Sequence, residues 1–294
     1  MLLELEHVRN KTKRKDPHHM NDENTENSDQ YSINRVRNGL SRRSLLAMLS
    51  GGAIGAASGL SMLSSTSFGQ EKPNQKASGK TPSDFDILNL ALNLEYLESE
   101  FYTYAVTGQG IDALGISSDG VGTKGETTNG QKLEFTDQVL FATAKELAFD
   151  EQQHVKLLRS LLGKKAIAKP AINLTALGVG FGSEAEYLTV GRAMEDTGVS
   201  AYGGAAPLLK SKEILGIAAR ILADEAYHMG NVRLFIAQKG VQVKPTDDKD
   251  ILPPPAGPKF FCVDNRALSL IRTPEEVLKI ARPFFPNGLN GALK

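Results

Sequence analysis

The sequence predicts an all-α protein organised around a four-helix bundle, with a long crossover between the second and third helices. Four segments carry apolar residues at the three- and four-residue spacing of an amphipathic helix, over about residues 84–107, 132–162, 183–202 and 211–239. Titratable residues interrupt these apolar stripes in the order Glu, Glu-x-x-His, Glu, Glu-x-x-His. That order is the ligand list of a bundle with a dinuclear metal site in its core.

The string Asp-Glu-x-x-His occurs twice, at residues 150–154 and 224–228. Residues three apart share a helix face, so each string turns one carboxylate and one imidazole the same way. Unpaired buried charge is costly, so several inward carboxylates are tolerable only if cations neutralise them. The predicted ligands of two divalent ions are Glu95, Glu151, His154, Glu195, Glu225 and His228.

The spacing alone is weak evidence, because Glu4 and His7 show it in a leader where no metal site is credible. The prediction rests on two features that occur together. Both histidines of the folded body belong to an Asp-Glu-x-x-His string, and the flanking leucines and isoleucines place both on the inward stripe of a helix. A metal-free core with the same residues is the alternative.

Glu98 competes with Glu95 on the first helix, since it lies one turn away. We prefer Glu95 because Tyr102 follows it by seven residues, just as Tyr202 follows Glu195. Glu98 is then expected at the edge of the site, supporting the ligands, and Glu100 is expected to face solvent. Tyr102 and Tyr202 are predicted either to hydrogen-bond near the site or simply to pack in the core.

The first seventy residues predict export. Residues 1–40 are polar and predict a disordered leader. Residues 41–69 open with Arg42-Arg43, continue through a moderately apolar run and end in small residues, which is typical of a signal peptide of the twin-arginine (Tat) type. Met20 is an alternative start. Cleavage would leave an exported, periplasmic or extracellular protein without a stable membrane anchor.

The remaining segments connect or extend the bundle. Residues 70–83 form a linker, and the bundle spans 84–240. The glycine-rich stretch 108–130 predicts a flexible insertion, with a lid over the site as the alternative. The proline-rich residues 241–294 predict an extension with one short helix, capped by Thr273, that wraps the bundle or meets a neighbouring subunit.

Composition narrows the function classes. There are 34 basic and 34 acidic residues, so net charge gives no support to a nucleic-acid partner. The single cysteine, Cys262, excludes an intrachain disulfide framework and a cysteine-based zinc site. Any metal ligands must therefore be carboxylates and imidazoles.

These motifs resemble the ferritin-like superfamily, and within it the desiccation-related ferritin-like proteins of bacteria and plants. The resemblance covers about residues 84–240 and rests on residues 90–98, the two Asp-Glu-x-x-His strings and Glu195. It implies a ferritin-like bundle with the same six ligands, of which Glu151 and either Glu195 or Glu225 bridge. In related diiron proteins the aspartate contacts cross between helices, so the resemblance pairs Asp150 with His228 and Asp224 with His154.

The leading functional hypothesis is a stress-protective oxidoreductase holding two Fe or Mn ions and acting on peroxide, dioxygen or ferrous iron, either ferroxidase-like or catalase-like. It needs no catalytic residue beyond the metal ligands and no organic cofactor; a homo-oligomer is compatible with it. The alternative is a non-catalytic, stress- or desiccation-protective bundle with structural metal or none. A third hypothesis has Met194 or Met229 ligate haem.

Overall fold

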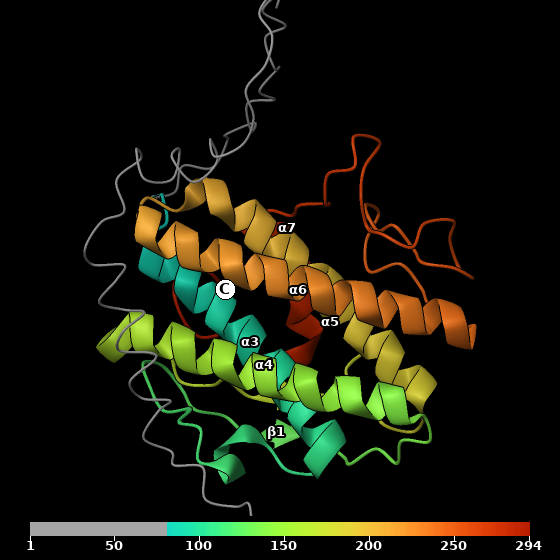
Figure 1. The fold of residues 1–294 in the computed structure, drawn as a ribbon. Coiled ribbons are helices and arrows are strands. Elements are labelled where there is room, and N and C mark those ends of the chain that lie inside the picture. The colour runs from blue at the N-terminus through green and yellow to red at the C-terminus, as the bar shows by residue number, and fades with distance from the viewer. Residues whose placement is uncertain (1–80) are drawn as a thin grey trace, which may run out of the picture. The chain divides into compact units, whose positions relative to one another are not determined.

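The computed structural model describes residues 81–294 (Figure 1). The leader and export signal predicted for residues 1–69 lie outside the described residues. Within the described part, no helix combines the length and the apolar character needed to cross a membrane.

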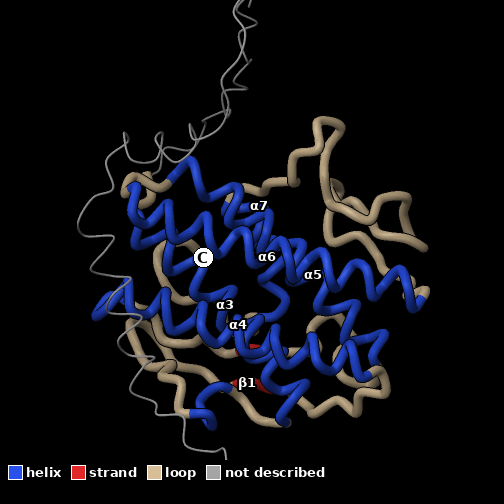
Figure 2. Tube along the Cα trace, viewed as in Figure 1, coloured by secondary structure: helices blue, strands red, loops and turns tan. Residues whose placement is uncertain are grey.

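Four long helices form the bundle and confirm the all-α prediction: α3 (Asp84–Thr107), α4 (Gln138–Leu162), α5 (Glu184–Ala205) and α6 (Lys212–Lys239). Helix α3 packs mainly on α4, and α5 packs mainly on α6 (Figures 1 and 2). A shorter helix, α7 (Pro274–Ala281), packs against α5. Single 3-10 turns occur at Ile111–Leu114, Gly163–Lys165, Ala206–Leu208 and Arg282–Phe284.

Helix boundaries follow local capping chemistry. Ser83 and Asp86 form a reciprocal capping box at the start of α3, and Gly108 ends that helix in the left-handed conformation (φ 78°). Helix α4 begins six residues later than its predicted start at Lys132. The backbone N–H of Leu133 donates to the carbonyl of Ala105, and the Asp137 side chain caps the helix that follows.

The glycine-rich loop 108–130 is tied to the crossover between α4 and α5. Strand β1 (Thr127–Thr128) pairs in parallel with β2 (Ile172–Asn173), and Val121 forms a bridge with Ile167. The prediction of a free, flexible insertion is therefore wrong for this segment. The backbone hydrogen bonds to the crossover hold it in place over the outer face of α3.

Buried arginines attach the C-terminal extension to the bundle. Arg233 of α6 donates to the carbonyls of Ile251, Lys259 and Phe260 at 2.7–3.0 Å. Its Nη1 also donates to Asp196 of α5 at 2.7 Å. We call the arginines that hold the extension, together with their carboxylates, the arginine network: Arg192, Asp196, Arg233, Asp247, Asp250 and Arg272.

Candidate metal centre

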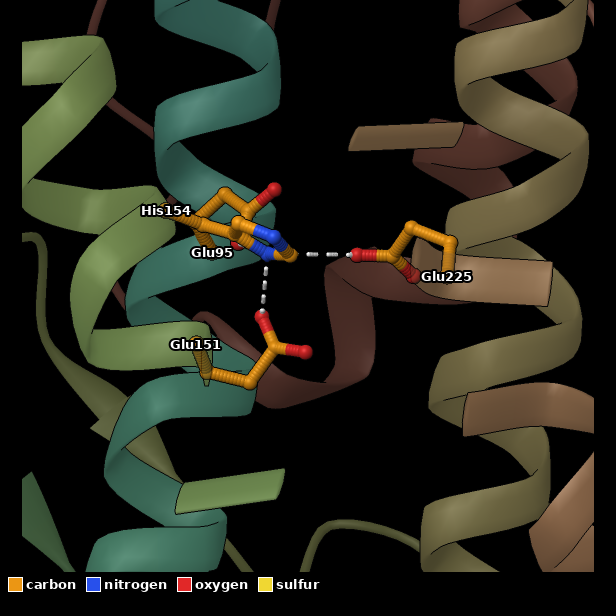
Figure 3. Close-up of side chains that lie close together, drawn as sticks. All are labelled: Glu95, Glu151, His154 and Glu225. Carbon is orange, nitrogen blue, oxygen red and sulfur yellow. Dashed lines mark hydrogen bonds and ion pairs between the residues drawn. The ribbon is translucent and has the colours of Figure 1, made fainter. Parts of the chain in front are cut away.

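The six side chains predicted as ligands meet inside the bundle. Helices α3 and α5 each supply one glutamate, and α4 and α6 each supply a glutamate and a histidine. The four glutamates are fully buried, and the ring centroids of the two histidines lie 6.1 Å apart. Figure 3 shows the part of the cluster formed by Glu95, Glu151, His154 and Glu225. Residues 130 positions apart in the sequence thus converge on one point.

Each histidine turns its Nδ1 atom toward the carboxylates. His154 Nδ1 lies 3.2 Å from Glu95 Oε2 and 3.3 Å from Glu151 Oε2. His228 Nδ1 lies 2.9 Å from Glu151 Oε1 and 3.5 Å from Glu195 Oε2. Glu151 therefore directs one oxygen to each histidine. Glu225 completes the first group, with Oε1 at 3.7 Å from His154 Nδ1.

The donor atoms fall into two overlapping sets. Glu95, Glu151, His154 and Glu225 can place one donor atom each within 4.8 Å of the others, and so can Glu151, Glu195 and His228. The two sets share Glu151, which is the arrangement expected of two neighbouring ion positions.

Apart from the imidazole–carboxylate contacts given above, several of these donors have no hydrogen-bond partner. They are Glu95 Oε2, Glu151 Oε1, Glu195 Oε2, both oxygens of Glu225 and His228 Nδ1. Buried polar atoms are satisfied in the great majority of cases, so a cluster of unsatisfied ones calls for a ligand. Carboxylate oxygens and imidazole nitrogens suit iron and manganese. The residues present therefore fit a pair of such ions.

Two aspartates contact the outer nitrogens of the histidines, and the contacts cross between helices. His228 Nε2 lies 3.3 Å from Asp150 Oδ2, and His154 Nε2 lies 3.3 Å from Asp224 Oδ2. A proton on Nε2 donated to an aspartate leaves Nδ1 free as a donor to metal. The aspartates thus fix the ring orientation that an ion requires.

Two tyrosines cross between α3 and α5 in the same manner. The Tyr102 hydroxyl donates to Glu195 Oε1 at 2.5 Å, and the Tyr202 hydroxyl donates to Glu95 Oε1. Each glutamate that stands alone on its helix is therefore held by the tyrosine of the other helix. The second oxygen of each of these carboxylates points to the histidines.

Glu98 is a fifth buried carboxyl group beside the centre. Gly198 of α5 makes room for it: a Cβ at this position would lie 2.2 Å from Glu225 Oε2 and 3.3 Å from Glu98 Oε1. Burial, followed by the charge of Glu225, raises the pKa of Glu98 well above its ordinary value. Sequence reasoning missed Gly198, although a glycine three residues after Glu195, on an inward helical face, was an available signal.

Glu100 was expected in solvent, and this expectation is wrong. Its side chain is buried, and its Oε1 lies 2.7 Å from Lys169 Nζ. The outer face of α3 is covered by the 108–130 loop and by the crossover, which the assumption of a single buried stripe does not allow for.

Without ions, protons balance the charge of the cluster. Burial raises the pKa of Glu95 to about 7, and burial followed by the charge of Glu151 raises that of Glu225. Burial alone would lower the pKa of His154, but Glu95 and Glu151 raise it to about 12. Burial opposes ionisation of Glu151, yet His154 and His228 outweigh it and lower its pKa. Cations binding here would replace these protons.

A small cavity of about 140 Å³ leads from the surface between α4 and α6 toward His228. We call it the mouth; Asp150, Asp224 and Tyr227 line it together with Glu146. The Asp224 side chain is 38% exposed, whereas the glutamates behind it are fully buried. A molecule entering the mouth would therefore meet the histidine–aspartate pairs first and the buried glutamates after them.

The haem hypothesis does not fit this structure. Met194 lines a cavity of only about 20 Å³, and Met229 packs against Val199 and Cys262 in a small apolar cluster. Neither methionine faces a space of porphyrin size.

A family model for the ferritin-like domain matches residues 83–238, a span that covers the four long helices except the last residue of α6, and every predicted ligand. The chain belongs to the ferritin-like domain family. The match agrees with the resemblance inferred from the motifs.

Two curated relatives are similar to this ferritin-like chain. The ferritin-like catalase Nec2 of Nesocodon mauritianus is 22% identical over 272 residues, covering 73% of this chain and 86% of the relative. The desiccation-related protein PCC13-62 of Craterostigma plantagineum is 27% identical over 181 residues, covering 53% of this chain and 54% of the relative.

Proposed function

We propose that this protein holds two iron or manganese ions and acts as an oxidoreductase on hydrogen peroxide. The observation that carries the proposal is the pair of donor sets sharing Glu151, in the first of which both oxygens of Glu225 are buried without a hydrogen-bond partner. Two such ions, when bound, supply the two-electron change that peroxide or dioxygen requires. Ferrous iron is the third candidate substrate.

The residues of the centre would have different roles in holding the two ions. Glu95 and His154 would hold one ion, and Glu195 and His228 the other. Glu151, which belongs to both donor sets, would be shared between the two ions, and Glu225, whose Oε1 lies 3.7 Å from His154 Nδ1, would complete the first set. Asp150 and Asp224 would keep the imidazole rings in the orientation for binding. Glu98, whose pKa burial and the charge of Glu225 raise, would hold a proton beside the centre more firmly than an exposed glutamate.

Two features favour peroxide as the substrate. The mouth has a volume of about 140 Å³, which suits a small molecule rather than a large organic one. One relative is named a ferritin-like catalase. We further propose export through the twin-arginine route, supported by Arg42-Arg43 and the small residues near Gly69.

The test is elemental analysis of natively expressed protein, combined with peroxide and Fe(II) consumption assays. We expect two ions per chain and peroxide turnover that disappears in Glu151→Gln. Glu213→Gln, at the exposed start of α6, serves as the control and should retain both. Two bound ions with peroxide left intact would contradict the proposed substrate, and Fe(II) oxidation by the same sample would then favour ferroxidase chemistry.

A non-catalytic, stress-protective bundle is the second candidate, and the similarity to a desiccation-related protein favours it. In this case metal would raise the melting temperature without any turnover of peroxide, dioxygen or Fe(II). Calorimetry of metal-loaded and metal-free samples, set beside the assays, separates the two functions.

A further inference from the structure

A second polar pocket lies over the outer face of α3 and shares no residue with the metal centre or its mouth. Its volume is about 420 Å³, within the range of roughly 300–1,000 Å³ that small-molecule sites occupy. The 108–130 loop and the crossover form its walls. The side chains that matter to its chemistry are Glu100, Tyr104, Asp112, Lys124, Glu126 and Lys169.

A buried ion pair borders this pocket. Glu100 and Lys169 are 1% and 2% exposed, and Glu100 Oε1 lies 2.7 Å from Lys169 Nζ. The lysine also donates to Thr127 Oγ1 at 2.6 Å. Glu100 Oε2, by contrast, is buried and has no hydrogen-bond partner. A buried carboxylate oxygen without a donor is costly, so it marks a place where a donor from outside would be stabilising.

Gly110 keeps this oxygen free of a covering side chain. Its φ of −83° is one that any residue adopts, so backbone conformation does not require glycine here. A Cβ at this position would lie 2.5 Å from Glu100 Oε2 and 3.1 Å from Tyr104 Cε2. The absence of a side chain thus preserves the space between the carboxylate and the tyrosine ring.

The charges around the pocket favour a cation. Three acidic residues and two lysines line it, which leaves one negative charge in excess. Lys124 is already paired with Asp112 and Asp119, and Glu126 at the rim forms no ion pair within the described part of the chain. An entering anion would meet an excess of carboxylates, whereas an entering cation would find both Glu100 Oε2 and Glu126.

A metal ion does not suit this site. The acidic side chains of the pocket are not among the described groups whose donor atoms converge closely enough to hold one. In addition, the ammonium group of Lys169 already occupies the other oxygen of Glu100. An organic ammonium ion needs only single hydrogen-bond acceptors, and its carbon chain could lie along the ring of Tyr104.

We propose that this pocket binds a small aliphatic amine through an ammonium group on Glu100 Oε2. A second ammonium group, as in a short diamine, would reach Glu126 at the rim. The 108–130 loop, which contributes nothing to the metal centre, would then serve to build this site.

The test is calorimetric titration of the full chain with 1,4-diaminobutane, with butane-1,4-diol as the uncharged analogue. We expect saturable one-to-one binding of the diamine, and binding of the diol weaker by about tenfold or more, because a charge-assisted hydrogen bond is lost. Glu100→Gln should weaken diamine binding by about tenfold or more for the same reason, and Glu126→Gln by a smaller factor. Glu213→Gln on the exposed start of α6 should bind as the unmodified chain does.

Gly110→Ala provides a second variant if Glu100→Gln fails to fold, since it keeps every charge and fills the space at Oε2; it too should lose the diamine. Equal binding of diol and diamine would overturn the proposal, as would a folded Glu100→Gln that binds unchanged or an unmodified chain that shows no saturation. The titration is repeated on Glu225→Gln protein. Because the two sites share no residue, a damaged metal centre should leave diamine binding intact, so either proposal can fail alone.

Discussion

The bundle buries carboxylates in two regions and treats them in opposite ways. In the arginine network, Asp196 accepts from Arg192 at 3.2 Å and from Arg233 at 2.7 Å, so the chain supplies its own counter-charges. In the metal centre, the four glutamates form no ion pair with any arginine or lysine of the described residues. The first region is charge-paired within the chain, although Arg192 Nε, Asp196 Oδ1 and Asp250 Oδ1 have no hydrogen-bond partner. The second is complete only with protons or with ions from outside.

Removing an arginine should produce the largest effect on stability. Arg233→Met removes the closer of the two donors of Asp196 and leaves three backbone carbonyls without their donor, and breaking a buried pair costs about 3–5 kcal/mol. Denaturant unfolding monitored by circular dichroism measures the change. Arg220→Met, at an exposed position of the same helix, should stay within about 0.5 kcal/mol of the unmodified chain. Equal unfolding of the two variants would show that the network does not stabilise the fold.

Neutralising a glutamate of the metal centre should increase the stability of the metal-free protein, whereas removing an arginine decreases it. Glu225→Gln removes one of several repelling carboxyl groups and should raise the metal-free melting temperature by a few degrees, corresponding to about 1 kcal/mol. It should at the same time lower the bound metal below two ions per chain. Asp196→Asn is the matched change in the arginine network and should lower the melting temperature. A loss of stability in both variants would mean that the two regions do not differ.

The crossed aspartates should tune metal affinity without changing the fold. Asp224→Asn withdraws the carboxylate 3.3 Å from His154 Nε2, and loss of such a partner lowers affinity about 10–100-fold. Asp150→Asn should lower metal affinity by a similar factor, because Asp150 contacts His228 Nε2 in the same way. Competition with a chromogenic chelator measures both. Unchanged affinity in the two variants would show that the aspartates do not orient the rings.

Glu95 of the metal centre and Asp247 of the arginine network should contribute to stability with opposite pH dependence. Burial raises the pKa of Glu95 to about 7 from an ordinary 4.5, so its contribution to metal-free stability is full below pH 4.5 and is lost as pH rises toward 7. The hydrogen bond from Arg272 lowers the pKa of Asp247, so that contribution is present at neutral pH and is lost as pH falls through the lowered pKa.

Denaturant unfolding of metal-free protein across pH 3–8 tests this comparison. We expect Glu95→Gln to flatten the decline on the alkaline side, and Asp247→Asn to flatten the loss on the acid side. Metal affinity should rise with pH over the range in which Glu95 loses its proton, because ions displace protons from the ligands. Affinity that is constant between pH 5 and 8 would contradict the charge balance described for the centre.

Much of the centre could be predicted from sequence because helical periodicity is local. Three-residue spacing fixes a shared face, so Glu151 and His154 could be paired before any fold was known. Helical spacing could not predict the pairing of Asp150 with His228, because the two residues lie on different helices. The family resemblance predicted that pairing.

What could not be predicted depends on parts of the chain that lack periodicity. Helix α3 is buried on most of its faces, by α4 on one side and by the loop and crossover on another, so Glu100 is enclosed although it lies off the inward stripe. The later start of α4 has a similar cause, because tertiary hydrogen bonds from Leu133 and Thr136 compete with the first helical turn. Gly198 matters because the side chains of Glu225 and Glu98, which lie on other helices, approach it inside the bundle.

The tyrosine and aspartate contacts have a consequence for chain architecture. Each joins a residue of the α3–α4 half to a residue of the α5–α6 half, and Glu225 completes the donor set built mostly on the first half. Neither half therefore contains a whole site. A polypeptide severed within the crossover should yield two pieces that are incompetent alone and complementary when mixed, and an ancestor of half this length could have built the centre only by pairing with a copy of itself.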